Sequence, residues 1–279
     1  MTGTAVITLV HGRAAHLRTQ HEALRRSTLE PDDYIVVAID DPFPGRWDPP
    51  GRPRPHVVPV AASTEGLPLA KARNLGARCA IARGADVLVF LDVDCLPDPG
   101  LVAAYATASR CPRTKDHLLC GPVAYLPPPP PGGYELDTVA GLAEPHPGRP
   151  APDPGEVLVD PGGHRLFWSL SFAVGSETWS SLDGFDETYV GYGAEDTDFG
   201  QRAASQGVAL AWVGGARSYH QHHPVSDPPV EHLDDIVRNA TYFHQTWGFW
   251  PMGGWLDEFT NLGLIEKRKG RYVRLKTTK

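Results

Sequence analysis

The chain has 279 residues, which is long enough to bury a full hydrophobic core without disulfide staples. Its 41% hydrophobic and 21% charged residues lie in the range of ordinary globular proteins and exclude wholesale disorder and a coiled coil. The formal net charge of −7 argues against a surface that follows nucleic-acid phosphates, so no nucleic-acid partner is expected.

The cysteines, at positions 79, 95, 111 and 120, form neither a CxxC pair nor a zinc-knuckle spacing, and they are too sparse for a secreted disulfide framework. We therefore expect reduced thiols. The longest apolar run near the start, Ala5–Val10, is far shorter than a signal-peptide core with its flanks or the ~20 residues of a membrane span. These observations predict a cytoplasmic protein.

Apolar, β-branched runs alternate with helical patterns along the first third of the chain. The predicted strands cover residues 5–10, 34–39 and 87–91, and the predicted helices cover 16–26 and 69–83. This alternation predicts an α/β fold with a parallel sheet. The run 87–91 is apolar throughout, so we expect it in the middle of the sheet, buried on both faces. Gly84 is placed to end the second helix, and Asp98 before Pro99 to begin a third.

Two proline-rich segments, at residues 42–59 and 122–161, interrupt this pattern. Proline removes a backbone donor and fixes φ, so neither segment is expected to form a helix or a central strand. Long irregular segments in compact domains are commonly either functional lids or disordered. The second segment is therefore either a mobile cover over a site or a surface excursion without a role.

The rest of the chain contains an apolar segment at 166–174, a predicted helix at 195–205 closed by Gly207, and a predicted strand at 208–213. The aromatic residues Trp247, Phe249, Trp250 and Trp255 predict a small accessory core, with sugar stacking as the alternative. The basic segment 266–279 predicts a solvated tail. Such a tail could also close over a diphosphate or make peripheral contact with an anionic membrane.

Two carboxylates follow the predicted buried strand directly. Asp92-Val93-Asp94 lies at the carboxyl end of the sheet, where open α/β folds bind ligands. On extended backbone the side chains of i and i+2 point the same way, so both carboxylates are expected to address one ligand. Hard oxygen ligands suit Mg²⁺ or Mn²⁺, although acidic strand ends also cap helices.

Three imidazoles lie within the run His220-Gln221-His222-His223, beyond the last predicted strand. They could complete a coordination sphere of oxygen and nitrogen ligands, or form a surface histidine patch. No HExxH spacing is present, which disfavours a zinc hydrolase.

Glu195 and Asp196 open a predicted helix behind Gly191 and Gly193. The helix dipole favours ionised carboxylates at this position. A carboxylate near the mouth of a pocket is a suitable general base, a role worth ~10² to 10⁴ in rate, while helix capping alone is the simpler alternative.

The ordered set of motifs resembles the family 2 glycosyltransferases with the GT-A fold, in the branch whose second half is related to β-galactosyltransferases. The motifs are Asp40-Asp41, Lys71-Ala72-Arg73-Asn74, Asp92-Val93-Asp94, Gly184-Phe185-Asp186-Glu187, Glu195-Asp196 and His220. The resemblance runs from about Ala5 to about His223. It implies a Rossmann-like fold of three layers with a mostly parallel central sheet.

The resemblance also implies a binding site for the nucleotide. Asp41 or its neighbour Asp40 would bind the uracil of a UDP-sugar, although Pro42 replaces the usual small residue. Arg73 would reach the base or the diphosphate, and Asn74 would support the loop. Asp92 would contact the ribose or the metal.

For the metal and the reaction, the resemblance implies that Asp94 holds Mn²⁺ or Mg²⁺ in a DXD motif. His220 would be a late metal ligand, with His222 and His223 as alternates. Asp196 would deprotonate the acceptor hydroxyl, and Glu195 would orient the acceptor.

We therefore predict one GT-A domain over residues 1–279, with a nucleotide-sugar-binding half at 1–99 and an acceptor-binding and catalytic half at 100–279. The predicted reaction is inverting transfer of a galactose, N-acetylgalactosamine or glucose type of sugar to a glycan, a lipid-linked sugar or a small molecule. The alternatives are a haloacid-dehalogenase-like phosphohydrolase and a non-catalytic module that binds nucleotide sugars or glycans.

Overall fold

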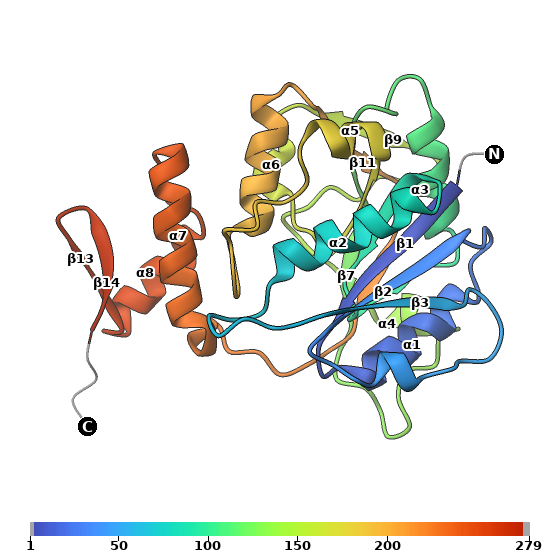
Figure 1. Cartoon of the computed structure of the whole chain (residues 1–279), viewed down its shortest axis with the longest axis horizontal. Coiled ribbons are helices and arrows are strands. Elements are labelled where there is room, and N and C mark those ends of the chain that lie inside the picture. The colour runs from blue at the N-terminus through green and yellow to red at the C-terminus, as the bar shows by residue number, and fades with distance from the viewer. Residues whose placement is uncertain (1–2, 276–279) are drawn as a thin grey trace.

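The first four strands lie side by side and parallel, as the alternating pattern predicts. A computed structural model describes residues 3–275 (Figure 1). Its first elements are β1 (Gly3–Val10), α1 (Ala14–Leu24), β2 (Asp33–Ile39), the 3₁₀ turn η1 (Pro44–Arg46), β3 (Pro55–Val60), α2 (Leu69–Ala82) and β4 (Ala85–Leu91). β1 pairs in parallel with both β2 and β4, and β3 pairs in parallel with β2. Gly84 has a φ of +94° just past α2, which confirms it as the glycine that ends this helix.

The second half of the chain extends this sheet to eight strands in the order β3-β2-β1-β4-β10-β6-β11-β9. The added strands are β6 (Leu118–Cys120), β9 (Val157–Asp160), β10 (Ser171–Gly175) and β11 (Leu210–Val213). β10 runs antiparallel to β4 and β6, β11 is parallel to β6, and β9 is an antiparallel edge. The sheet is mostly parallel, as predicted, and β4 lies in its interior.

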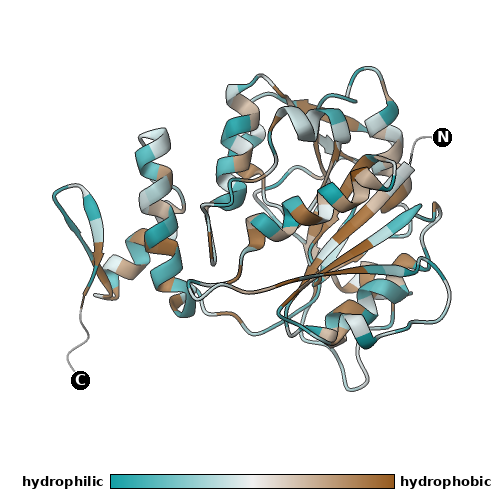
Figure 2. Cartoon of the chain, viewed as in Figure 1, coloured by the Kyte–Doolittle hydropathy of each residue, from teal (hydrophilic) through white to brown (hydrophobic). Residues whose placement is uncertain are grey.

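Helices cover both faces of the sheet and make three layers. α2, α5 (Ser176–Ser181) and α6 (Glu195–Ser205) pack on one face, while α1 and α3 (Leu101–Arg110) pack on the other. Val87–Leu91 is buried throughout, which confirms its prediction as a central strand. The most hydrophobic segments coincide with the central strands, and polar residues lie on the outer helix faces (Figure 2).

A smaller sheet begins directly after the Asp-x-Asp motif. It has the order β5-β12-β7-β8, formed by β5 (Cys95–Pro97), β12 (Ser218–His220), β7 (Val123–Tyr125) and β8 (Glu144–Pro145). β12 pairs antiparallel with β5, which sets His220 opposite Cys95. The second sheet therefore brings the histidine segment to the Asp-x-Asp motif.

The proline-rich segments contain more regular structure than the sequence predicts. β3 is an edge strand, where proline is tolerated. β7 is an inner strand of the small sheet, so the prediction for 122–161 is wrong there, because the prolines precede and follow the three residues of β7. The expectation of no helix is also wrong, because the short helix α4 (Val139–Leu142) lies in this segment, together with β8 and β9.

The structure corrects one further helix prediction and confirms another. α3 begins at Leu101 and not after Asp98, whose carboxylate accepts a hydrogen bond from the Gly100 N–H at 3.0 Å. α6 spans Glu195–Ser205 as predicted, and it is preceded by the 3₁₀ turn η2 (Gly163–Leu166) and by α5.

The C-terminal part packs beside α6 and away from the central sheet (Figure 1). It contains the 3₁₀ turn η3 (Val230–His232), α7 (Leu233–Trp247), α8 (Gly253–Asn261), β13 (Ile265–Arg268) and β14 (Arg271–Arg274). Trp250 and Trp255 pack against a small hydrophobic core of this C-terminal part, as predicted. The basic segment is a β-hairpin over 265–274, not a solvated tail, and its last lysines lie outside the described residues. Within 3–275, no helix is both long and apolar enough to cross a membrane.

Candidate active site

The Asp-x-Asp motif lies in a turn and not on extended backbone. β4 ends at Leu91, and the Cys95 N–H donates to the Asp92 carbonyl at 2.8 Å, which closes a tight turn. The two carboxylates consequently have different partners. Asp92 Oδ1 lies 3.2 Å from Arg73 Nη2, and Asp94 Oδ2 lies 3.1 Å from Arg13 Nη1. The prediction that both carboxylates address one ligand relied on extended backbone, and the turn shows that this reason is wrong.

Asp94, His220 and His223 form a group whose ligand atoms all lie within 4.8 Å of one another. Asp94 Oδ1 is 3.6 Å from His220 Nε2, and Asp94 Oδ2 is 3.3 Å from His223 Nε2. Asp94 Oδ1 is buried and has no hydrogen-bond partner. A carboxylate oxygen left unpaired beside two imidazoles is a donor set that fits a divalent cation.

Electrostatics keep this carboxylate ionised. Burial opposes the charge, but the His223 hydrogen bond, His220 and Arg13 together lower the pKa of Asp94 to about 2. Burial lowers the pKa of His220, which favours the neutral imidazole that a metal requires.

The other predicted ligands lie apart from this group. His222 is exposed, and its backbone N–H donates to the Tyr134 hydroxyl at 3.0 Å. Asp92 is not a member of the group. Among the predicted metal ligands, the structure therefore brings together Asp94, His220 and the alternate His223.

Arg73 is buried between carboxylates. Its side chain is 5% exposed, Nη1 lies 3.2 Å from Glu195 Oε1, and the guanidinium stacks 5.2 Å from the Phe185 ring. Arg73 thereby links the end of β4 to the start of α6. In this arrangement it contacts two acids of the site, whereas the resemblance implied a contact with the nucleotide.

The start of α6 holds Glu195 and Asp196 in an environment that disfavours their charge. Burial and the Asp196 charge raise the pKa of Glu195 to about 7, against the lowering effect of the Arg73 charge. Burial also raises the pKa of Asp196, against the lowering effect of Arg73. Carboxylates with raised pKa values are suited to accept a proton near neutral pH.

A left-handed turn leads into α6 and is held by α7. Gly191, Gly193 and Ala194 have φ values of +76°, +93° and +74°. The Asn239 amide donates to the carbonyls of Val190, Tyr192 and Gly193 at 3.1, 3.3 and 3.0 Å. A Cβ on Gly191 would lie 2.1 Å from Asp235 Oδ2, so only glycine fits there.

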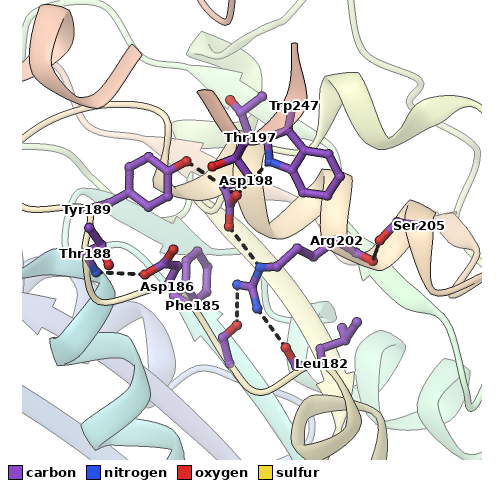
Figure 3. Close-up of polar contacts among 12 residues, drawn as sticks. Leu182, Phe185, Asp186, Thr188, Tyr189, Thr197, Asp198, Arg202, Ser205 and Trp247 are labelled. Atoms are coloured by element: carbon purple, nitrogen blue, oxygen red, sulfur yellow. Dashed lines mark hydrogen bonds and ion pairs between the residues drawn. The ribbon is translucent and has the colours of Figure 1, made fainter. Parts of the chain in front are cut away.

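Asp198 connects α6 to its surroundings through one buried carboxylate (Figure 3). Oδ2 accepts from Arg202 Nε at 2.9 Å, and Oδ1 accepts from Trp247 Nε1 at 2.8 Å. Arg202 in turn donates to the carbonyls of Leu182 and Gly184 at 2.8 and 2.5 Å. The network fixes α6 against both α7 and the Gly184-Phe185 turn.

Asn74 supports that same turn, as the resemblance implied. Its Nδ2 donates to the Phe185 carbonyl and its Oδ1 accepts from the Phe185 N–H, both at 2.8 Å. Gly184 has a φ of +60°, and a Cβ there would lie 2.5 Å from Asn74 Oδ1.

Asp40 and Asp41 follow β2 at the carboxyl edge of the sheet. Asp41 accepts from the Gly12 N–H and from the Phe43 N–H, each at 2.9 Å, and so joins the loops after β1 and β2. Asp40 is exposed with a φ of +46°. Asp41 has its oxygens engaged by backbone, whereas Asp40 presents its side chain to solvent.

Sequence reasoning missed Arg13 and Tyr192. Arg13 lies in the loop after β1, at the sheet edge where ligands bind, and that position was its only signal. Tyr192 is 38% exposed in the turn before α6, and burial together with the charges of Asp196 and Glu195 raises its pKa. Its ring stacks 4.6 Å from His232.

Residues 164–224 match the family model described as the N-terminal domain of galactosyltransferase. Two curated relatives are both named validoxylamine A glucosyltransferase, from Streptomyces hygroscopicus subspecies limoneus and from strain 5008 of subspecies jinggangensis. Each is 28% identical over 228 residues, which cover 74% of this chain and 49% or 52% of the relative. The chain thus spans about half the length of the curated relatives it matches.

Solved structures show the same fold at low identity. GalNAc-T7 with UDP, GalNAc and Mn²⁺ aligns with a TM-score of 0.54 at 16% identity, over 80% of this chain and 44% of that one. S. aureus TarS 1–349 aligns with a TM-score of 0.54 at 13% identity, over 87% and 66% of the two chains. The order of the sheet and these structural similarities show that the chain has the GT-A fold, and the family match over residues 164–224 together with the curated relatives supports a glycosyltransferase.

Proposed function

We propose that the protein transfers a hexose or N-acetylhexosamine from a UDP-sugar to an acceptor hydroxyl, with a divalent cation and with inversion at the anomeric carbon. One observation carries this proposal. The Asp94–His220–His223 group and the Glu195–Asp196 pair are two distinct centres, and Arg73 with Asp92 connects them. Such an arrangement can hold an anionic leaving group at one centre and a proton acceptor at the other.

The nucleotide is proposed to bind along the carboxyl edge of β1, β2 and β4. Asp40 is available to a uracil, and Asp41 shapes the loop beside it by binding the Gly12 N–H. Arg13 is 35% exposed, so its guanidinium is accessible to a phosphate. Arg73 is proposed to orient Asp92 toward the ribose instead of contacting the diphosphate itself.

Asp94, His220 and His223 would hold Mn²⁺ or Mg²⁺, and Asp92 remains a candidate to approach it from the ribose side. When bound, the cation supplies positive charge opposite the departing diphosphate. The unpaired Asp94 Oδ1 is the atom that most requires such a partner.

Asp196 is proposed as the general base that takes the proton of the acceptor hydroxyl. Its side chain is less buried than that of Glu195, which is tied to Arg73 and is proposed to orient the acceptor. A base on the face opposite the leaving group permits in-line displacement and hence inversion. Tyr192, partly exposed in the turn that precedes both acids, offers a ring on which an acceptor can stack.

The curated relatives are named glucosyltransferases, so we propose glucose as the first donor sugar to test, before galactose and N-acetylgalactosamine. Their name also contains validoxylamine A, so we propose a small molecule as the first class of acceptor to test. The phosphohydrolase alternative loses support, because Asp92, its would-be nucleophile, is held by Arg73.

The test is a thermal-shift series with UDP, GDP and TDP, each with Mn²⁺ and again with EDTA. Ligand at ~100 times its dissociation constant stabilises by roughly 2.7 kcal/mol, which raises the midpoint by several degrees. A shift for UDP that requires Mn²⁺ supports the proposal, and no shift with any nucleotide contradicts it. NMR of the product then tests inversion, because a retained anomeric configuration would exclude the base assigned to Asp196.

A further inference from the structure

The proline-rich segment places one arginine in the interior without a polar partner. Arg149 is 6% exposed, and its Nε, Nη1 and Nη2 atoms are all buried without a hydrogen bond. Across residues 3–275 we find no ion pair that includes it. A guanidinium stays charged at any accessible pH, and burying an unpaired charge is strongly unfavourable. The burial of Arg149 without a hydrogen-bond partner therefore requires a physical reason.

Two indole rings hold the Arg149 guanidinium. Its Cζ atom lies 5.0 Å from the ring centroid of Trp168 and 4.9 Å from that of Trp212. Trp212 is fully buried in β11, whereas Trp168 is half-buried in the loop before β10. Cation–π contacts offset part of the free-energy cost of desolvating the guanidinium, but no negative charge within the described residues compensates its positive charge.

The loop that carries Trp168 reaches the candidate active site. The Leu170 carbonyl accepts the Asp92 N–H at 3.0 Å. The Ser169 N–H faces Asp196 and partly offsets the rise that burial causes in the pKa of that carboxyl. Arg149 therefore lies directly behind a loop that joins the two acidic centres.

A row of rings extends from Trp168 to the metal-capable group. Successive ring centroids are 4.8 Å apart from Trp168 to His146, 6.0 Å from His146 to Tyr125, and 5.1 Å from Tyr125 to His220. Burial raises the pKa of Tyr125, and the Arg149 charge offsets part of that rise. The Arg149 charge thus acts on Tyr125, the ring that precedes His220 in the row.

We propose that Arg149 is an electrostatic positioning residue of the donor site. Its uncompensated charge lies against Trp168, at the start of the row of rings. From there it attracts the anionic diphosphate of the donor to the Asp94–His220–His223 group. This inference rests on the proposed use of a UDP-sugar. By Coulomb's law, two unit charges at an effective dielectric constant of ~20 change an association constant about tenfold when they lie about 10 Å apart, and less at larger separations.

The experiment compares Arg149→Met, Arg149→Lys and the control Arg165→Met, which removes an exposed arginine that stacks on Phe249. Titration calorimetry in Mn²⁺ measures binding of UDP, UMP and uridine to each full-length variant. Arg149→Met should weaken UDP binding about tenfold and UMP binding less, and it should leave uridine binding unchanged. Arg149→Lys should restore most of the UDP affinity, and Arg165→Met should bind all three ligands like the wild type.

Thermal midpoints separate this role from a structural one. Loss of an uncompensated buried charge is expected to leave the midpoint of Arg149→Met at or above that of the wild type. Equal loss of affinity for all three ligands, or a lowered midpoint that Arg149→Lys shares, would overturn the inference. Unchanged UDP affinity in Arg149→Met would also overturn it. Failure of the wild type to bind UDP would instead contradict the proposed function.

Discussion

Arg73 Nη1 lies 3.2 Å from Glu195 Oε1, and both side chains are buried. The same guanidinium reaches Asp92, so a single cation on α2 offsets one acid at the end of β4 and another at the start of α6. The geometry of the proposed base is thereby coupled to that of the Asp-x-Asp turn. Loss of this partner would leave Glu195 as an unpaired buried carboxylate and Asp92 as an unpaired, partly exposed one.

Replacement of Arg73 by methionine is expected to lower the free energy of unfolding by about 3–5 kcal/mol, because it leaves buried carboxylates uncompensated. Urea denaturation measures the loss. Arg83→Met, at the residue that follows the last residue of α2, is the matched control, since its pair with Asp33 is much more exposed and should contribute at most about 1 kcal/mol. Similar small losses in both variants would show that the Arg73 pairs stabilise little.

Glu195 is expected to make stability depend on pH. Its pKa is raised from 4.5 to about 7 in the folded protein, so the folded state binds the proton more tightly than the unfolded state. Stability from this group is therefore present below pH 4.5 and lost as the pH rises to about 7. The midpoint of the wild type should fall relative to that of Glu195→Gln between pH 5 and pH 8. A constant difference across that range would mean that Glu195 titrates normally.

Asp94→Ala is expected to abolish the Mn²⁺-dependent part of UDP binding, because it removes the central carboxylate of the cation group. Titration calorimetry with Mn²⁺ and with EDTA measures this. His222→Ala is the control, since His222 is exposed and lies outside that group. If Asp94→Ala retained the Mn²⁺ dependence, the cation would have to bind elsewhere.

Asp196→Asn is expected to lower kcat by about 10² to 10⁴ while UDP binding stays intact, because an amide cannot accept the proton. The pKa of Asp196 is raised by burial, so the acid limb of the wild-type rate should lie above the ordinary aspartate value of 3.8, with the rate falling as pH falls through it. The limb should be absent from the residual activity of the variant. Parallel loss of UDP affinity and turnover would instead favour helix capping.

Asp198→Asn is expected to lower the free energy of unfolding by about 3 kcal/mol, because it breaks the buried pair with Arg202. The indole of Trp247 donates to the same carboxylate, so Trp fluorescence should report the change. Asp234→Asn is the control, because its pair with Arg274 is exposed and should contribute little. Equal midpoints for the two variants would contradict the role assigned to Asp198.

The elements of the first third were predictable because their signals are local. Apolar runs such as Val87–Leu91 fix a central strand, and the first-turn acids with Gly207 delimit α6 from sequence alone. β7 was not predictable, because three residues between prolines become a strand only by pairing with β12 from far along the chain.

The site divides in the same way. The acidic residues of the site could be predicted, since ligands bind at the carboxyl ends of strands and helix starts stabilise carboxylates. Their partners could not, because the contacts of Arg73 with Glu195 and of Arg13 with Asp94 join residues more than eighty positions apart. Asp92 and Asp94 diverge because the turn closed by the Cys95 N–H ends the extended backbone before the motif begins.

The hydrogen bonds from Asn239 to the turn before α6 determine what a shortened chain can be expected to do. The match to the galactosyltransferase model ends at residue 224, yet three carbonyls of the turn that presents Glu195 and Asp196 are satisfied only from α7. A fragment ended at that boundary would keep every proposed ligand of the cation and lose the support of its base. We expect such a fragment to separate nucleotide binding from turnover.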